Sequence, residues 1–254
     1  MKDRKTLFAV LSILMSLVSV SIGEEQLGIE FTADFMSKYI WRGQNLSDDS
    51  VFEPGLTLSY ENLSASIWGN MDLTNINGNS GDFSEVDYSL DYSVDFPGIE
   101  GLGYSIGLIY YDFPGTTVKD TTEVYWGFSL DCFLSPSITI YHDVDEAEGS
   151  YVSLSAGHSI ENIFEIFPEV PVGMDIGASL GWGSGSYDKY YWGTGQSKLQ
   201  DLVLSMSFPI AVGDWTIAPS INYATLVSDD IRDTDAYGTD SDFFFAGVSL
   251  SKSF

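Results

Sequence analysis

The feature that most constrains the fold is an alternation of apolar and polar side chains with a period of two, which recurs through most of the chain. Side chains of a β-strand point alternately to its two faces, so this period predicts strands with one apolar and one polar face. Residues 84–96 show it most clearly, with Tyr88, Leu90 and Tyr92 on one face and Asp87 and Asp91 on the other. We predict twelve strands, roughly at 27–41, 51–61, 63–72, 84–96, 102–112, 121–132, 137–145, 149–160, 171–183, 198–209, 215–226 and 242–254.

These strands predict an all-β protein, a transmembrane antiparallel up-and-down β-barrel of about 12 strands. In lipid every backbone group must be paired within the protein, so a spanning sheet has to close on itself. A soluble β-sandwich also alternates and is the alternative. The barrel better explains a chain that ends on Phe254 and has aromatic residues near its strand ends. These aromatic residues are Tyr39, Trp41, Tyr110, Trp126, Trp182, Phe208 and Trp215.

The lengths of the connections also favour a barrel, which has short turns on its periplasmic side and long loops outside. The connections at 62, 97–101, 133–136 and 210–214 are short. Most of the connections between them are longer: 42–50, 75–83, 185–197 and 227–241. Residues 161–170 do not fit this arrangement, and their Ile163, Phe164, Ile166 and Phe167 suggest a short interfacial helix.

The N-terminus resembles a secretory signal. Three basic residues, Lys2, Arg4 and Lys5, precede an apolar run from Leu7 to Val20, and small residues precede Glu24. The alternative is a membrane anchor, but the run is shorter than the ~20 residues that a spanning helix needs. We predict a signal peptide at 1–23, a barrel at 24–254, and export to a bacterial outer membrane.

Composition excludes several classes of function. The net charge of −27 opposes nucleic-acid binding, because the chain would repel phosphates. The 44% hydrophobic content argues against disorder. A single cysteine, Cys132, cannot form an intrachain disulfide, and we interpret it as a small apolar residue near a strand end. No cofactor motif is present, and we predict none.

One segment resembles a known family. Residues 37–47 read Ser-Lys-Tyr-Ile-Trp-Arg-Gly-Gln-Asn-Leu-Ser, and strand-like segments follow at 51–60 and 63–70. Over residues 34–72 this is similar to the start of the TorF-type family of porins, small outer-membrane β-barrel proteins. The resemblance implies an outer-membrane channel and brings no catalytic residues. From the residues alone, Gly43 permits a turn, and Arg42 either pairs with an acidic lumen residue or marks the membrane border.

The parity of the strands predicts a lumen lined by carboxylates. Lys38 and Arg42 are its few inward basic residues. Charged rings of one sign set ion preference in a pore, so we predict a passive channel for small cations or cationic solutes. The alternative role of these acids is to keep a non-conducting lumen hydrated. The candidates are Glu30, Asp34, Arg42, Glu53, Asp87, Asp91, Asp95, Glu123, Asp131, Asp143, Asp175 and Asp201. Inward aromatic residues could narrow the pore: Trp68, Tyr125, Tyr141, Tyr151 and Phe245.

The outer loops suggest two further hypotheses. Tyr187 to Trp192 is a tyrosine-rich segment that favours a structural or adhesive barrel, which binds ligands through its loops. Asp233, Asp235 and Asp240 bear a partial likeness to a calcium loop but lack its closing Glu, so a mobile acidic loop is the preferred interpretation.

A hydrolase is the third hypothesis, and we predict that the chain is not an enzyme. The chain has two histidines, His142 and His158, and the neighbours Asp143 and Ser159 point to the opposite strand face. A hydrolase would therefore need a histidine paired with a catalytic residue on a neighbouring strand. We expect the partners to be outer-membrane lipid, the barrel-assembly machinery acting on Phe254, and small cationic solutes or ions.

Overall fold

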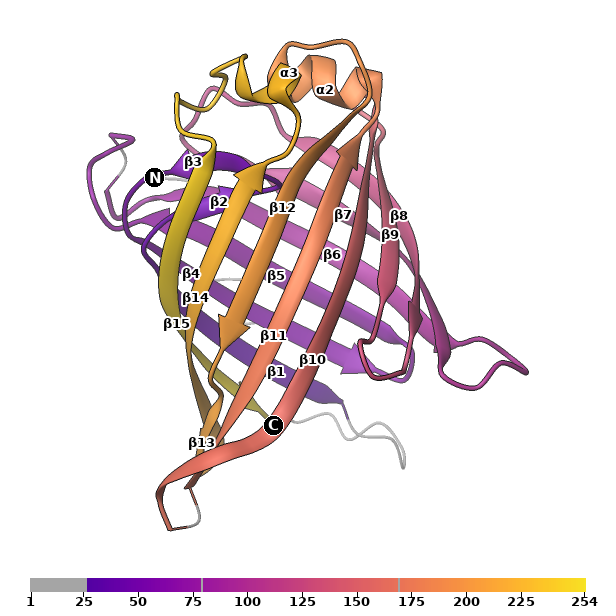
Figure 1. Cartoon of the computed structure of the whole chain (residues 1–254), viewed down its shortest axis with the longest axis vertical. Coiled ribbons are helices and arrows are strands. Elements are labelled where there is room, and N and C mark those ends of the chain that lie inside the picture. The colour runs from indigo at the N-terminus through magenta and orange to yellow at the C-terminus, as the bar shows by residue number, and fades with distance from the viewer. Residues whose placement is uncertain (1–26, 79, 169) are drawn as a thin grey trace.

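The computed structural model describes residues 27–78, 80–168 and 170–254, so the predicted signal peptide at 1–23 lies outside the described residues. Strands dominate the described part, and helices occur in two connections at one end (Figure 1). In chain order the elements are β1 (Gly28–Met36), β2 (Tyr39–Trp41), β3 (Gln44–Ser47), β4 (Val51–Tyr60), β5 (Leu63–Asp72), β6 (Phe83–Asp95), β7 (Leu102–Asp112), β8 (Thr121–Leu130), β9 (Ser137–Asp143), β10 (Ser150–Phe167), β11 (Val170–Gly183), α2 (Gly185–Trp192), β12 (Lys198–Ser207), β13 (Ile210–Val212), β14 (Trp215–Leu226), α3 (Asp229–Arg232) and β15 (Asp242–Ser253).

The main sheet closes into a barrel. Each strand pairs antiparallel with its neighbours in chain order, in the sequence β1-β4-β5-β6-β7-β8-β9-β10-β11-β12-β14-β15. β1 then pairs with β15 over Glu30 to Met36, which closes the ring. The three-residue β13 pairs with β11 and β14 at one rim. The predicted fold class, a closed antiparallel up-and-down barrel of twelve strands, is confirmed in the described residues.

The outer face of the barrel is apolar. Alternate residues of neighbouring strands project their side chains outward, as Tyr88, Leu90 and Tyr92 do on β6 and Leu108 does on β7, and each is about two-fifths exposed. Among the described residues, no helix has the length and apolar character needed to cross a bilayer. A belt of this kind around a closed sheet is the surface that lipid accepts, because no backbone edge remains unpaired.

The two ends of the barrel differ. At one end, here called the turn end, connections such as 61–62 and 131–136 are short. The first strand, β1, begins at this end, and the last strand, β15, ends there. At the other end, here called the loop end, lie α2, α3, β2, β3 and the long loops (Figure 1). The predicted sorting of connections by length is therefore present. Phe254 lies at the turn end and its backbone N–H donates to Ile29 O at 2.9 Å.

The predicted interfacial helix at 161–170 is wrong. β10 continues to Phe167 and β11 starts at Val170, so the two strands form a long hairpin that extends beyond the neighbouring turns (Figure 1). Phe164 pairs with Val172 after a register shift that follows Ile160. The apolar residues of this segment are therefore strand residues. The connection between β10 and β11 is therefore short, as the other connections at this end of the barrel are.

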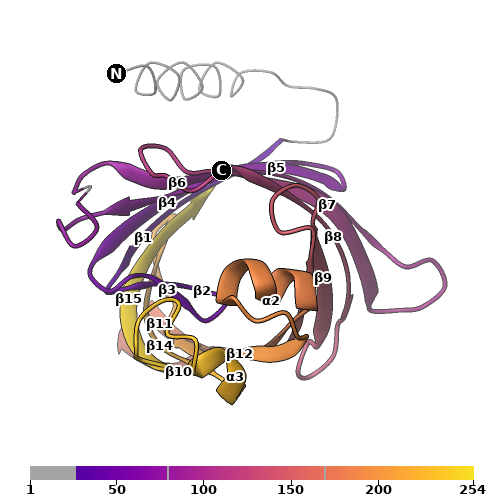
Figure 2. The same cartoon turned by 90° about the horizontal axis from the view of Figure 1, so that it is seen from above.

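The first predicted strand, 27–41, is too long. β1 ends at Met36, and β2 and β3 form a separate two-stranded sheet. Ser37 marks the departure: its backbone N–H and its hydroxyl both bond the backbone of Ala246, at 2.8 and 2.9 Å. The chain then reverses at Arg42 and Gly43, whose φ angles of 48° and 79° match the two left-handed positions of a tight hairpin turn. This hairpin lies inside the ring of strands (Figure 2).

The apolar belt predicts that charge is tolerated poorly on one face only. We expect Leu90→Arg, near the middle of β6, to destabilise the barrel by about 2–4 kcal/mol, because Leu90 faces outward. Ser93→Arg, of opposite parity on the same strand, is the matched control. Denaturant unfolding in lipid vesicles measures both, and equal losses of stability would contradict the lipid-facing assignment.

Candidate functional site: a constriction in the lumen

The β2–β3 hairpin is fitted closely against the barrel wall. A Cβ added to Gly43 would lie 2.7 Å from Leu226 Cδ2 and 2.9 Å from Asp201 Cβ, so only glycine fits this approach and its left-handed φ. Tyr39 of β2 is buried, and its hydroxyl donates to Glu85 Oε2 at 3.0 Å. The hairpin is therefore held by the lumen face of the wall.

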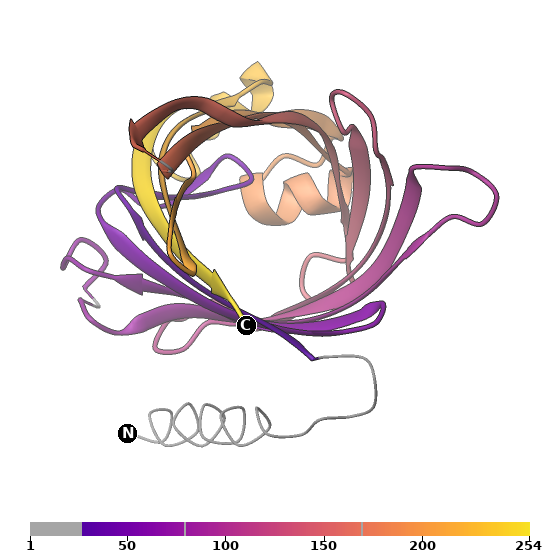
Figure 3. The ribbon, with the colours of Figure 1, turned by 90° about the horizontal axis from the view of Figure 1, so that it is seen from below.

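Helix α2 enters the lumen from the opposite side (Figures 2 and 3). Ser184 caps its start, because the Ser184 hydroxyl accepts from Tyr187 N–H at 3.4 Å, and Gly193 ends it with φ 75°. Tyr187 is completely buried. Trp192 packs with Leu226 and Ile231 in a small apolar cluster that ties α2 to α3. We call the β2–β3 hairpin, α2 and the wall residues that they touch the constriction.

A buried ion pair joins the hairpin to the wall. The two terminal nitrogens of Arg42 donate to the two oxygens of Glu123 at 2.8 and 2.7 Å. Tyr111 Oη adds a bond to Glu123 at 2.8 Å, and Arg42 Nη1 donates to Tyr187 Oη at 3.1 Å. The side chains of Arg42 and Glu123 are 8% and 1% exposed. The fork geometry and the two tyrosines satisfy charges that would be costly if left alone.

Aromatic rings surround the Arg42 guanidinium. Its central carbon lies 4.4 Å from the ring centroid of Trp41, 4.5 Å from Tyr141 and 4.3 Å from Tyr151. The ring of Tyr187 is 5.7 Å away. Cations are attracted to aromatic faces at these distances. The hairpin tip, the wall and α2 therefore meet at one side chain.

Beside the hairpin, carboxylates gather on the wall formed by β1, β4 and β6. Asp34 and Glu53 are direct cross-strand neighbours, and Glu53 lies close to Glu85. Within the described residues, no Lys or Arg forms an ion pair with Asp34, Glu53, Glu85 or Asp87. We call these four residues the acidic wall. Like charges in direct register destabilise a sheet, so this arrangement is costly to the fold.

The structure separates the predicted lumen carboxylates other than Asp143 into three groups. Asp34, Glu53 and Asp87 belong to the acidic wall. A second group has polar partners: Glu123 binds Arg42, Asp201 accepts from Tyr151 at 2.9 Å, Asp91 accepts from Tyr125 at 2.6 Å, and Asp175 accepts from Ser207 at 3.3 Å. Glu30, Asp95 and Asp131 are exposed towards the turn end.

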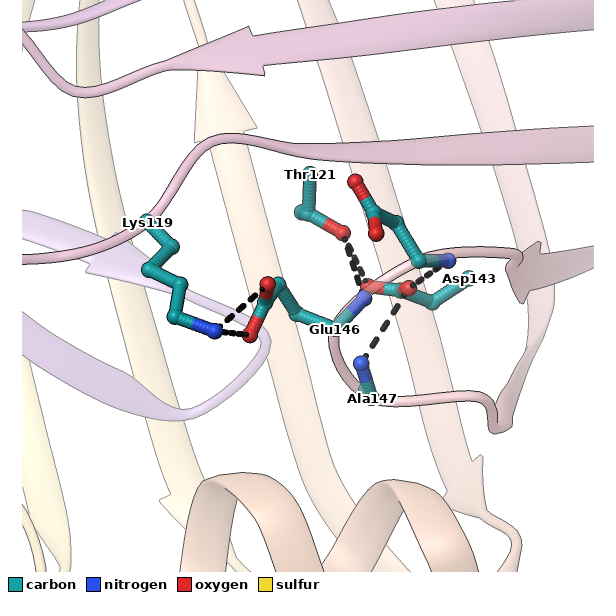
Figure 4. Close-up of polar contacts among 6 residues, drawn as sticks. Lys119, Thr121, Asp143, Glu146 and Ala147 are labelled. Atoms are coloured by element: carbon teal, nitrogen blue, oxygen red, sulfur yellow. Dashed lines mark hydrogen bonds and ion pairs between the residues drawn. The ribbon is translucent and has the colours of Figure 1, made fainter.

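Asp143 is taken up by a loop (Figure 4). Its carboxylate accepts from Thr121 Oγ1 at 2.8 Å and from the backbone N–H groups of Asp145 and Ala147 at 2.9 and 3.2 Å. Nearby, Lys119 donates to both oxygens of Glu146 at 2.8 Å. Asp143 is fully buried, so its visible role is to fix the loop between β9 and β10.

The acidic loop at 227–241 is anchored to the end of β14. It contains α3, and the Arg232 side chain donates to Leu226 O at 2.5 Å and Thr225 Oγ1 at 2.9 Å. Asp233 ends this helix, and Asp235 has φ 49°. Within the described residues, no group of three or more His, Cys, Asp or Glu side chains is arranged to hold a metal ion. Asp233, Asp235 and Asp240 therefore do not form such a group.

The histidines lie apart from the constriction. His142 Nδ1 is 2.9 Å from Ser150 Oγ, the cross-strand pair that a hydrolase would need. In the described part of the chain, no carboxylate bonds the other His142 nitrogen, and Asp143 is engaged elsewhere. The His158 ring stacks on Phe133 with centroids 4.3 Å apart. Cys132 is exposed in a turn.

Several residues of the constriction were not among the sequence candidates. Glu85 has the parity of Asp87 and was identifiable from the same alternation. Tyr111 carried no signal beyond strand parity. Tyr39, which the sequence placed among the aromatic residues near strand ends, lies on the β2–β3 hairpin. For α2, Ser184 and Gly193 are the capping residues that predict an eight-residue helix, whereas the aromatic content of the segment suggested an outer binding loop.

The docking of α2 depends on a missing side chain at Gly149. A Cβ there would lie 2.3 Å from Tyr187 N, a backbone atom that cannot step aside. We expect Gly149→Ala to displace α2 at a cost of about 1–3 kcal/mol, as overpacking usually does. Faster trypsin cleavage after the exposed Lys189 would report it. Gly195→Ala, where nothing lies within 4 Å, should cleave like the native chain, and equal rates in all three would refute the contact.

Asp188 makes the docking of α2 sensitive to pH. Burial raises the pKa of its carboxyl to about 6, although Gln200 and Lys198 oppose this shift. The undocked carboxyl titrates near its usual ~3.9, so docking is favoured fully below that pH and weakens until about pH 6. At each pH we divide the amide-exchange rate of α2 in the native chain by the rate in Asp188→Asn, which removes the intrinsic pH dependence of exchange. We expect this ratio to rise from pH 4 to 7. A constant ratio would contradict this.

Comparison with known proteins places the fold. No family model matches the sequence, and no curated protein matches it. Among solved structures, the KdgM porin in complex with disordered oligogalacturonate aligns with 89% of this chain and 99% of its own, at 9% identity and a TM-score of 0.50. The NanC porin aligns with 88% and 98% of the two chains, at 13% identity and a TM-score of 0.49. The likeness to KdgM is one of fold, and the TorF-type resemblance stays a prediction.

Proposed function

We propose that this chain is an outer-membrane channel through which small cations or cationic solutes diffuse, with its passage narrowed by the β2–β3 hairpin and α2. The observation that carries the proposal is the acidic wall, which faces the lumen beside the hairpin. Carboxylates without basic partners lower the energy of a passing cation and raise that of an anion.

The electrostatics of the lumen support this preference. Arg42 is the buried basic side chain of the constriction, and its charge is matched by its ion pair with Glu123. Oligogalacturonate, the ligand named for KdgM, is an acidic sugar polymer. The acidic wall would repel such a polyanion, so the proposed solute has the opposite charge.

The outer-membrane location, the cleaved signal peptide and membership of the TorF-type family belong to the same proposal. The apolar belt, the closed ring and a C-terminal Phe254 in register with β1 support insertion into lipid by a barrel-assembly machinery. An adhesive role has less support from this segment, because Tyr187 and Trp192 are buried and Tyr190 is the exposed aromatic residue of α2.

A salt gradient across a planar bilayer tests the preference directly. At a pH at which the acidic wall is ionised, we expect the reversal potential to have the sign of cation permeation, and to fall towards zero in Glu53→Gln/Asp87→Asn, because half of the acidic wall is then neutral. Glu161→Gln, an exposed carboxylate on the β10–β11 hairpin, is the matched control and should leave the potential unchanged. Anion preference in the native barrel would overturn the proposal, and absence of conductance would favour a ligand-binding barrel.

A further inference from the structure

The surroundings of Arg42 form a complete recognition site for one chemical group. Glu123 accepts two parallel hydrogen bonds from it, and Tyr187 Oη accepts a third. Tyr141 and Tyr151 place their rings 4.5 and 4.3 Å from the central carbon of the guanidinium. We call Glu123, Tyr141, Tyr151 and Tyr187 the cage.

The cage belongs mainly to the barrel wall and not to the hairpin that fills it. Glu123, Tyr141 and Tyr151 stand on β8, β9 and β10, three neighbouring strands held by continuous pairing. Tyr151 is fixed further by its bond to Asp201 at 2.9 Å, and Tyr111 fixes Glu123 at 2.8 Å. Arg42, in contrast, is delivered by the turn of a hairpin outside the main sheet. The wall part of the cage is therefore held by strand pairing and by hydrogen bonds from residues other than Arg42.

We propose that the cage is a binding site for the guanidinium group of solutes that enter the lumen, and that Arg42 occupies it as an internal competitor. The proposal rests on the proposed cation channel and names a class of solute for it. A solute that takes the place of Arg42 releases the hairpin tip from the wall, which couples binding to the width of the constriction.

The geometry selects guanidinium over other cations. A planar guanidinium presents parallel N–H donors to a carboxylate while its faces stack on aromatic rings, and it is weakly hydrated. A tetramethylammonium ion can approach the same rings but has no donor for Glu123. A potassium ion has neither a donor nor a flat face. The difference between guanidinium and tetramethylammonium therefore isolates the contribution of the hydrogen bonds to Glu123.

The test empties the cage and titrates it with guanidinium chloride at millimolar concentration, with single-channel current in potassium chloride as the readout. In Arg42→Ala we expect guanidinium to change the current at a concentration about 10- to 100-fold lower than in Arg42→Ala/Glu123→Gln, as expected for charge-assisted bonds. Tetramethylammonium should distinguish these two variants less than guanidinium does, because it is attracted by the charge of Glu123 but donates no hydrogen bond to it. The native barrel should need more guanidinium than Arg42→Ala, because Arg42 competes. Equal titrations in the two variants would overturn the proposal.

Two further measurements separate failure of the cage from failure of the channel. Calorimetry on the detergent-solubilised Arg42→Ala barrel detects guanidinium binding even where no current flows, and Arg42→Ala/Glu123→Gln should bind guanidinium about 10- to 100-fold more weakly. The native barrel needs no substitution to fold. In it, guanidinium should speed amide exchange at 39–47, and the same concentration of tetramethylammonium should not. Absence of binding in Arg42→Ala, or unchanged exchange in the native barrel, would refute the cage whatever the conductance.

Discussion

The closed ring of backbone hydrogen bonds is the constraint from which the other features follow. β1 pairs with β4 along one edge and with β15 along the other, so no strand of the ring has a free edge across the belt. In lipid each unpaired backbone group costs several kcal/mol, which makes this closure a condition of folding. Once the ring is closed, parity alone divides the side chains between lipid and lumen. The lumen face is then free to carry charges that the core of a soluble protein would exclude.

A charged lumen face also places a carboxylate, Glu123, where it is buried, and Arg42 compensates its charge. A buried Glu123 without a partner would be strongly destabilising, and so would a buried Arg42. Together they form a fork that Tyr111 and Tyr187 complete. Because Arg42 is on the hairpin, Glu123 on the wall and Tyr187 on α2, satisfying one pair of charges also positions both segments that narrow the lumen. The placement of the constriction is thus an electrostatic consequence of a wall carboxylate.

The alternation of side chains predicted the strands and the ring well, because a period of two is a direct property of extended backbone. It could not show where β1 leaves the wall, since Tyr39 and Trp41 keep the same period inside the lumen as they would in a longer strand. It likewise assigned Glu123 and Asp34 to one class, because parity gives a face and not a partner. Arg42 was placed next to an acidic lumen residue as one of two readings, but its partner on β8 depends on long-range packing. The buried position of Tyr187 depends on the close approach of α2 to Gly149, which no local pattern encodes.

The lumen carboxylates on the two sides of the barrel differ in whether they have hydrogen-bond donors. On β8 and β12 the lumen carboxylates have donors: Arg42 donates to Glu123, and Tyr151 donates to Asp201. These residues hold the constriction together, so structure accounts for them. On β1 and β4, Asp34 faces Glu53 directly, and among the described residues neither has a basic partner. Such a pair works against the sheet that contains it. A fold selected only for stability would not keep two acids in register there, whereas the cation channel that we propose would use their negative charge to attract mobile cations.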